Sequence, residues 1–350
     1  MLKIRSAGLA TIVLLAFAAA SCASAQTREP EPGDEITSLV ESIIEKHKLP
    51  GAAVFIRKDG QTLYQKSFGA YELDSVVPLA SATKWVTAAT VSTVIDEEGL
   101  SLDEMLSAHI SGIEPDKAAI TLRQLLSHTS GFPGDHALAE PTDQPLEDAA
   151  RKLAAMRLAA APGEELIYGG VSLQIAGYVA QSRAGKDWQL LFRERIATPL
   201  GWTEAVWDHP LRPPTVDNPG NPNLGAGLRI SASDYIAFLE MLDGKGVYRG
   251  KRILSASVVQ AILRDQAGDA LKSRLPPTVS PDWSYGLGCW CEIMNDAGEC
   301  LLANSGGAFG TLPWIDQRTG VYGVIVLETR MPLVFDDLMT FRELANGLAE

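Results

Sequence analysis

Strand-like patterns occur only near the two ends of this chain, and this distribution limits the folds that it can adopt. Near the start, residues 51–57 and 62–68 have strand character, and the turn Lys58-Asp59-Gly60 between them predicts a hairpin. Near the end, the predicted strands are residues 283–294, 301–302 and 321–327. Because no strand pattern lies between these two groups, one sheet is expected to be built from both ends of the chain.

Helical patterns fill the middle of the chain and also lie outside the strands. Apolar residues recur every three or four positions after Ser81, which predicts a buried helix that ends near Glu97-Glu98-Gly99. Residues 34–48 and 334–348 are predicted helices at the two ends of the domain. Further predicted helices are residues 146–159, 171–182 and 188–196, and a helix capped by Ser231.

These patterns divide the folded part of the chain, residues 34–350, into two lobes. Both ends contribute to a lobe of helices and sheet, at about residues 34–80 and 282–350. The segment between them, at about residues 81–281, is predicted to be an all-helical lobe inserted into the first. A chain of this length can hold one large core or two closely joined ones. The predicted fold class is therefore α/β (α+β).

The chain begins with a segment that predicts export. Residues 1–25 combine a basic start, an apolar run of about 14 residues and Ala23-Ser24-Ala25, a cleavage site of the A-x-A type. The apolar run is too short to span a bilayer comfortably. Cys22 offers lipid attachment as the less favoured alternative, because its surroundings only partly fit a lipoprotein cleavage site. We therefore predict a signal peptide over residues 1–25, a linker over residues 26–33, and a periplasmic or secreted mature protein.

The mature chain is strongly acidic. The complete chain has a formal net charge of −13 at pH 7, and removal of residues 1–25, which hold two basic and no acidic residues, makes it −15. Nucleic acids and anionic lipid surfaces are themselves polyanions, so a chain of this charge is not suited to bind them. No later segment is apolar enough to cross a membrane. We predict a small-molecule substrate as the partner, with no nucleic acid and no stable membrane insertion.

The cysteines and histidines of this chain are better explained by structural roles than by metal binding. Cys291 and Cys300 flank a predicted turn at residues 295–298, which fits a disulfide in an exported protein. With Cys289 included, three buried thiols fit equally well. The five histidines show no spacing typical of metal ligands, so no metal site is predicted.

Ser81 and Lys84 form a Ser-x-x-Lys motif at the start of the first buried helix. In a helix the two side chains lie one turn apart on the same face. The start of a helix also carries unpaired N–H groups and the positive end of the dipole, which favour a developing oxyanion. A buried lysine that stays neutral can take the proton of a serine hydroxyl. The motif occurs by chance about once in a chain this long, so by itself it is more simply explained by an N-cap serine and a solvated lysine.

Four further motifs follow Ser81-Ala82-Thr83-Lys84. They are Leu125-Leu126-Ser127-His128-Thr129-Ser130-Gly131, Pro162-Gly163 followed after four residues by Tyr168, Pro199-Leu200-Gly201-Trp202, and Tyr285-Gly286-Leu287-Gly288. Together and in this order, they resemble the serine β-lactamase and penicillin-binding-protein superfamily, in the branch of class C β-lactamases and their esterase relatives. The resemblance covers about residues 35–345. It implies an antiparallel sheet flanked by the N- and C-terminal helices, with an active site at the seam between the two lobes.

The resemblance also implies a role for each matching residue. Ser81 would be the acylated nucleophile, and Lys84 would help to remove its proton. Tyr168 would share its phenolic oxygen with Ser81 and the leaving group, with Lys84 as the cation that such a tyrosine needs. The oxyanion hole would combine the Ser81 N–H with an N–H from residues 306–308. No cofactor is implied.

The chain departs from the family pattern at two positions. Gly170 stands where the Tyr-x-Asn motif of the family has asparagine. The Lys/His-x-Gly motif aligns with Asn304-Ser305-Gly306, so the cation that helps to hold a substrate carboxylate is missing. An anionic β-lactam or D-Ala-D-Ala terminus has less to bind in such a site, unless Arg229 or Arg330 supplies a cation from elsewhere. The candidate substrate and oxyanion residues are Asn304, Ser305, Gly306 and Gly307.

These observations predict an exported serine hydrolase that cleaves a neutral ester or amide through an acyl-enzyme on Ser81, with esterase-like activity favoured. One alternative keeps the chemistry but changes the substrate: a β-lactamase or a D-alanyl-D-alanine carboxypeptidase. The other is a catalytically silent cell-wall-binding or regulatory protein of the same fold, which the two departures motivate. His128 is expected to make a structural hydrogen bond and not to act as a base. The natural substrate, the acyl group and the oligomeric state do not follow from the sequence.

Overall fold

The computed structural model describes residues 32–208 and 219–349. The predicted signal peptide lies outside these residues, as does most of the predicted linker. Helix α1 spans Pro32–His47, so the last two residues of that linker are already helical. Within the described ranges, no helix combines the length and the apolar character needed to span a bilayer.

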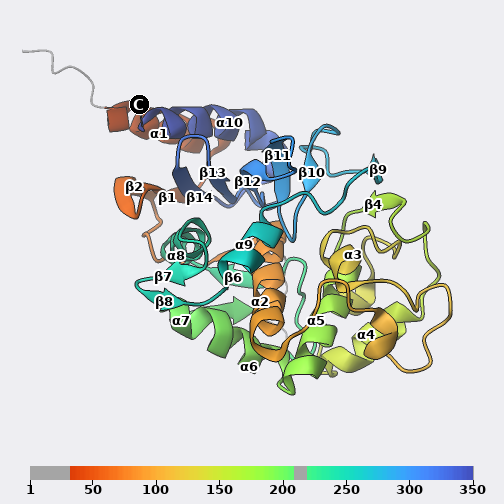
Figure 1. Ribbon diagram of the computed structural model, residues 1–350. Helices are drawn as coiled ribbons and strands as arrows, with labels where there is room; N and C mark the ends of the chain where they lie inside the picture. Colours follow the sequence, from red (N-terminus) through yellow and green to blue (C-terminus); the bar gives the residue numbers. More distant parts are fainter. Residues whose placement is uncertain (1–31, 209–218, 350) are drawn as a thin grey trace, which may run out of the picture.

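The main sheet has seven strands taken from both ends of the chain (Figure 1). Its order is β10-β11-β12-β13-β14-β1-β2 with antiparallel pairs, and β1 from the start of the chain pairs with β14 from its end. The strands are β1 (Gly51–Lys58), β2 (Gln61–Gly69), β10 (Ser284–Tyr285), β11 (Trp290–Met294), β12 (Cys300–Asn304), β13 (Leu312–Asp316) and β14 (Val321–Val326). The predicted sheet built from both termini is confirmed.

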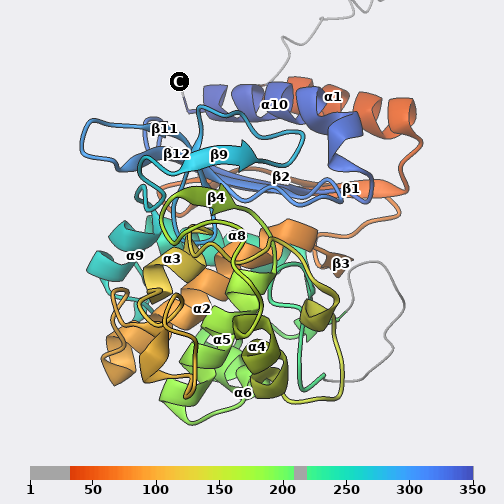
Figure 2. The ribbon, with the colours of Figure 1, turned by 90° about the vertical axis from the view of Figure 1, so that its right-hand side faces the viewer.

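Strand β1 is buried on both faces, and its alternating side chains enter two different cores. Ala52, Val54 and Ile56 pack in the core that α1 and α10 (Met331–Gly347) cover. Ala53 and Phe55 point to the opposite face and join the core of the helical lobe. Because successive side chains of a strand alternate between the faces, a strand covered on both sides is apolar throughout. Figures 1 and 2 show α1 and α10 side by side over one face of the sheet, with the helical lobe on the other.

Helix α2 (Thr83–Glu98) forms the centre of the helical lobe and is buried from Thr83 to Val94. A helix buried on all sides must satisfy its polar side chains internally. Accordingly, Thr87 Oγ1 donates to Leu224 O at 2.8 Å and Thr90 Oγ1 to Val86 O at 2.8 Å. The other helices are α3 (Leu122–Leu126), α4 (Leu146–Ala154), α5 (Val171–Ala184), α6 (Trp188–Phe192), α7 (Thr198–Leu200), α8 (Ala232–Asp243) and α9 (Ala256–Ile262).

Several strands escape prediction from the sequence pattern. Strand β13 contains Pro313, a residue that argues against a central strand. The predicted strand over residues 283–294 is divided into β10 and β11 by a turn in which Gly288 has a positive φ of 77°. Short strands also lie within the segment predicted to be all-helical: β5 (Val206–Trp207) and β6 (Leu228–Ile230), β4 (Glu165–Ile167) with β9 (Leu271–Arg274), and β7 (Val247–Tyr248) with β8 (Lys251–Arg252). Strand β3 (Val77–Pro78), which comes just before this segment, pairs with β6.

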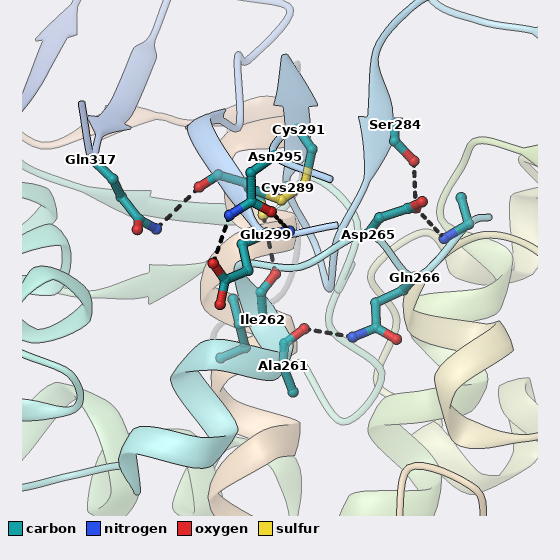
Figure 3. The surroundings of a disulfide bond; sticks show 12 residues. Ala261, Ile262, Asp265, Gln266, Ser284, Cys289, Cys291, Asn295, Glu299 and Gln317 are labelled. Carbon is teal, nitrogen blue, oxygen red and sulfur yellow. Dashed lines mark hydrogen bonds between the residues drawn. A yellow bond between two sulfur atoms is a disulfide. The ribbon is translucent and has the colours of Figure 1, made fainter. Parts of the chain in front are cut away.

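A disulfide joins Cys291 and Cys300 across β11 and β12, with their Cα atoms 5.1 Å apart (Figure 3). Of the two open alternatives for the cysteines, the structure contains the bridge, while Cys289 remains a buried thiol. Asn295 shapes the turn between the strands, because its Oδ1 accepts from the N–H of Glu299 at 3.0 Å. The bridge therefore closes the hairpin whose second strand ends at Asn304.

Candidate active site

Ser81 lies in the 3-10 turn Ala80–Ala82, directly before α2 begins at Thr83. The sequence placed Ser81 at the first residue of the α-helix, so the structure shifts that boundary by two residues. The preceding residue, Ala80, has a φ of 47°, a left-handed conformation that a residue with a Cβ rarely adopts. Such local strain is typical of segments that present a functional side chain. The Ser81 N–H makes no hydrogen bond within the described residues.

Lys84 reaches back from α2 to Ser81. Its Nζ donates to Ser81 Oγ at 3.2 Å and to the backbone carbonyl of Gly225 at 2.7 Å. The side chain is only 4% exposed. Burial lowers the pKa of Lys84 to about 8, although the Asp135 carboxylate partly opposes this shift. A buried amine of lowered pKa within hydrogen-bond distance of a serine hydroxyl is the arrangement that proton transfer from that hydroxyl requires.

Tyr168 follows β4 and brings its ring beside the same pair. Lys84 Nζ lies 4.6 Å from the centre of the Tyr168 ring, and Trp290 stacks on the ring with centroids 5.1 Å apart. Burial raises the pKa of Tyr168, a hydrogen bond with the Ser81 side chain partly opposes this, and the Asp135 charge adds to it. Tyr168 therefore stays protonated near neutral pH. Tyr168, which is far from Ser81 and Lys84 in the sequence, lies beside both of them in the structure.

Two contributors to this site carry no signal in the sequence. Gly225 supplies only a backbone carbonyl to Lys84, which no residue pattern can indicate. Asp135 Oδ1 accepts from the N–H of Gly170 at 2.9 Å, at the position where the family has asparagine. The contact exists because Gly134 and Gly169 cross so closely that a Cβ at Gly169 would lie 1.9 Å from Gly134 O. Only the folded chain brings these segments together.

The predicted oxyanion residues follow β12 and form a tight turn. Gly306 N–H donates to Asn304 Oδ1 at 2.9 Å, and Gly307 N–H donates to Thr311 O at 2.8 Å. Of residues 306–308, only Ala308 has an N–H without a hydrogen bond to another described residue. The Ser305 hydroxyl donates to Gly288 O at 3.1 Å and to Ser81 O at 3.4 Å, so it binds backbone and does not line the cavity.

A cavity of about 130 Å³ opens beside Ser81 and Tyr168. Its lining is largely apolar and includes Val279, Trp283, Trp290, Leu312, Met331 and Phe335. Among the described residues, no lysine, arginine, aspartate or glutamate lines it. Arg229, one of the two proposed sources of a cation, lies on β6 with its Nε 3.5 Å from Asp208 Oδ2. Arg330, the other, is exposed at the start of α10 and is not part of the lining.

His128 does not make the expected side-chain hydrogen bond. Its ring is buried between Tyr168 and Tyr285, with 4.9 Å between ring centroids in each pair. Neither ring nitrogen has a hydrogen-bond partner among the described residues. Burial, aided by the Lys84 cation, holds the pKa of His128 well below its usual value. The expected hydrogen bond is made instead by the backbone, where His128 O accepts from Ile167 N–H at 2.8 Å.

The family model named Beta-lactamase matches residues 36–347, which is most of the chain. The chain belongs to the Beta-lactamase family. It is similar to the solved structure of a candidate β-lactamase from Bacteroides dorei, with 32% identity, a TM-score of 0.76, and coverage of 87% of this chain and 97% of that chain. Protein Rv1367c of Mycobacterium tuberculosis is 24% identical, and the match covers 79% of this chain and 81% of that protein.

The structure of EstCE1, a hydrolase with promiscuous acyltransferase activity, has a TM-score of 0.72 and 19% identity, over 90% of this chain and 98% of that chain. At this identity the likeness shows a common fold alone. Together with the family match, these comparisons confirm the predicted fold class and the predicted family. The protein therefore has the fold of the Beta-lactamase family of serine hydrolases.

Proposed function

We propose that this protein is an exported serine hydrolase that cleaves neutral esters, and less readily amides, through an acyl-enzyme on Ser81. The observation that carries the proposal is the apolar cavity beside Ser81, in which none of the described residues offers a charge. A substrate carboxylate buried there without a partner would lose several kcal/mol of solvation. A neutral acyl group has no charge solvation to lose, and burial of its apolar surface favours binding.

The proposed acylation begins with attack of Ser81 Oγ on the ester carbonyl carbon, while Lys84 Nζ takes the hydroxyl proton. The N–H groups of Ser81 and Ala308 are the candidate donors to the oxyanion that forms. When the ester C–O bond breaks, Tyr168 gives its proton to the leaving alkoxide and recovers one from Lys84. Water then attacks the carbonyl carbon of the acyl-enzyme and gives a proton to Lys84. The bond from this carbon to Ser81 Oγ breaks, Tyr168 returns a proton to Ser81 and recovers one from Lys84, and the acid leaves. These roles agree with the pKa directions, because the lysine pKa is lowered and the tyrosine pKa is raised.

The silent-fold alternative would gain support if Lys84 were exposed or beyond hydrogen-bond reach of Ser81. Lys84 is instead buried, and its Nζ lies 3.2 Å from Ser81 Oγ. This contact favours an enzyme. Export remains part of the proposal on the strength of residues 1–25 alone, which lie outside the described residues.

A matched pair of substrates tests the proposed substrate class. The p-nitrophenyl ester of pentanoic acid and the mono-p-nitrophenyl ester of glutaric acid have acyl chains of the same length, but only the second ends in a carboxylate. We expect kcat/KM to be at least about 100-fold higher for the neutral ester, because the carboxylate would be buried unpaired. Nitrocefin, an anionic β-lactam, serves as the third substrate. Turnover of the anionic ester or of nitrocefin within tenfold of the neutral ester would favour the β-lactamase or carboxypeptidase alternative, with Arg330 as the first residue to test.

A further inference from the structure

A chain of buried polar contacts runs from α10, through β11, to the wall of the cavity. Arg342 on α10 forms a two-pronged ion pair with Glu292 on β11, in which Nη2 donates to Oε2 at 2.8 Å and Nη1 donates to Oε1. Glu292 Oε1 also accepts from Asn304 Nδ2 at 2.6 Å. Asn304 Oδ1 in turn accepts from the N–H of Gly306. Three elements of the sheet lobe are thus linked to the turn that faces Ser81.

The ion pair is an unusual feature to find buried. The side chains of Arg342 and Glu292 are only 9% and 6% exposed. A buried ion pair is often no more stabilising than a well-packed apolar pair of the same volume, because both charges lose their hydration. The pair does, however, place an ionised carboxylate, which accepts but cannot donate hydrogen bonds, beside the Asn304 amide.

That carboxylate fixes the orientation of the Asn304 side chain. With Nδ2 directed to Glu292, Oδ1 must point to the Gly306 N–H. The flipped amide would set its oxygen against the carboxylate and its N–H groups against the N–H of Gly306, so it would lose both hydrogen bonds. Asn304 is only 3% exposed, so an unmade hydrogen bond of its amide would be costly.

The turn held by Asn304 packs directly against the segment that carries Ser81. A Cβ at Gly307 would lie 2.1 Å from Leu79 O, so the two backbones are in contact there. Asn304, Gly306 and Ala308 all line the cavity beside Ser81. A small shift of Gly306 would therefore move the free N–H of Ala308 relative to the Ser81 carbonyl adduct, and oxyanion donors act only over a narrow range of distance.

We infer that Asn304 is a positioning residue for the oxyanion turn of residues 306–308, and that Glu292 and Arg342 act by holding its amide in one orientation. The inference rests on the proposed acyl-enzyme chemistry at Ser81. It also assigns a role to position 304 that differs from the family pattern. The family has a cation there that binds the substrate, whereas this chain has a neutral side chain that accepts a hydrogen bond from the backbone. Among the described residues that form this chain of contacts, the one cation is Arg342, and it is paired with Glu292.

Two double variants separate the acceptor role of Glu292 from its charge. Glu292→Gln/Arg342→Met and Glu292→Leu/Arg342→Met both remove the whole ion pair, so neither leaves a lone buried charge. Only the glutamine variant keeps a carbonyl oxygen for Asn304 Nδ2. We expect the glutamine variant to keep kcat for a neutral p-nitrophenyl ester within about threefold of wild type, and the leucine variant to lose about 30-fold in kcat with little change in KM.

Two further readouts distinguish positioning from a general structural effect. A boronic acid that mimics the tetrahedral adduct should bind the leucine variant more weakly by the same factor as the loss in kcat/KM, whereas binding of the product acid should not change. Asn304→Ala, which alters no charge, should reproduce the loss and should add little to it in the leucine background. This single variant also carries the test if the leucine variant does not fold.

The outcomes separate the inference from the proposed function. Suppose that the wild type turns over esters and forms a covalent adduct with a fluorophosphonate, but that both double variants and Asn304→Ala are as active as the wild type. The positioning role is then wrong, and the proposed function stands. The same holds if boronic acid binding does not follow kcat/KM. A wild type with neither turnover nor adduct would overturn the proposed function, and the inference with it.

Discussion

Replacement of Lys84 with methionine should lower kcat/KM for a neutral ester by about 1,000-fold, because it removes the amine that we propose takes the Ser81 proton. Methionine has nearly the length and shape of the lysine stem, so it should fill the same buried space. The measurement is the steady-state kinetics of p-nitrophenyl ester hydrolysis, with the melting temperature recorded to show that the variant is folded.

The pH dependence gives the same prediction a second readout. In the proposed mechanism the neutral form of Lys84 is the base, and burial lowers the pKa of Lys84 to about 8. The wild-type kcat/KM should therefore fall about tenfold per pH unit below this value and level off above it. The methionine variant should lack this rise with pH in its residual activity. Retention of a tenth or more of the wild-type activity, or a flat wild-type profile between about pH 6 and 9, would show that another group is the base.

Replacement of Gly169 with alanine should lower the free energy of unfolding by about 3 kcal/mol or more. The added Cβ would lie 1.9 Å from Gly134 O and 2.1 Å from Gly134 C, and backbone cannot move aside as a flexible side chain does. Because Tyr168 precedes this crossing, the relaxed backbone should also displace its hydroxyl from Ser81. A displacement of about 1 Å would cost about 100-fold in kcat. Urea unfolding and ester kinetics measure the two effects.

Gly170 provides the matched control, since it is the adjacent residue and is also a glycine. A Cβ at Gly170 would meet nothing closer than Asp135 Oδ1 at 3.7 Å, and its φ of −94° suits any residue. Gly170→Ala should therefore change stability by no more than about 1 kcal/mol. Equal stability losses in the two variants would contradict the close crossing of the two segments.

The overall layout of the fold could be predicted from the sequence because the burial pattern is regular. Residues 51–56 of β1 and the whole of β14 are buried because both faces of these strands are covered, and α2 is buried from Thr83 to Val94 because helices and sheet surround it. Strand β13 could not be predicted, because Pro313 argues locally against a strand that tertiary packing nevertheless forms. The short strands β4 and β9 pair across about 100 residues, and three or four residues are too few to show a period.

The candidate site shows the same division. Ser81, Lys84 and Tyr168 lie in motifs with recognisable neighbours, and the structure brings all three together. Ser305 also lies in such a motif, but its hydroxyl turned out to bind backbone, because a motif gives the position of a side chain in the chain and not its direction. Asp135 and Gly225 contribute through contacts that arise only when separate loops meet in the folded protein.

The most direct test of the account is the intact mass of the mature protein after incubation with a fluorophosphonate, measured for the wild type and for Ser81→Ala. We expect a single covalent adduct on the wild type and none on the variant, together with the loss of ester turnover in the variant. The buried Lys84 amine, 3.2 Å from Ser81 Oγ, is the reason to expect this reactivity at Ser81. A folded wild-type protein that forms no adduct, or an adduct that persists in Ser81→Ala, would contradict the assignment of Ser81 as the nucleophile.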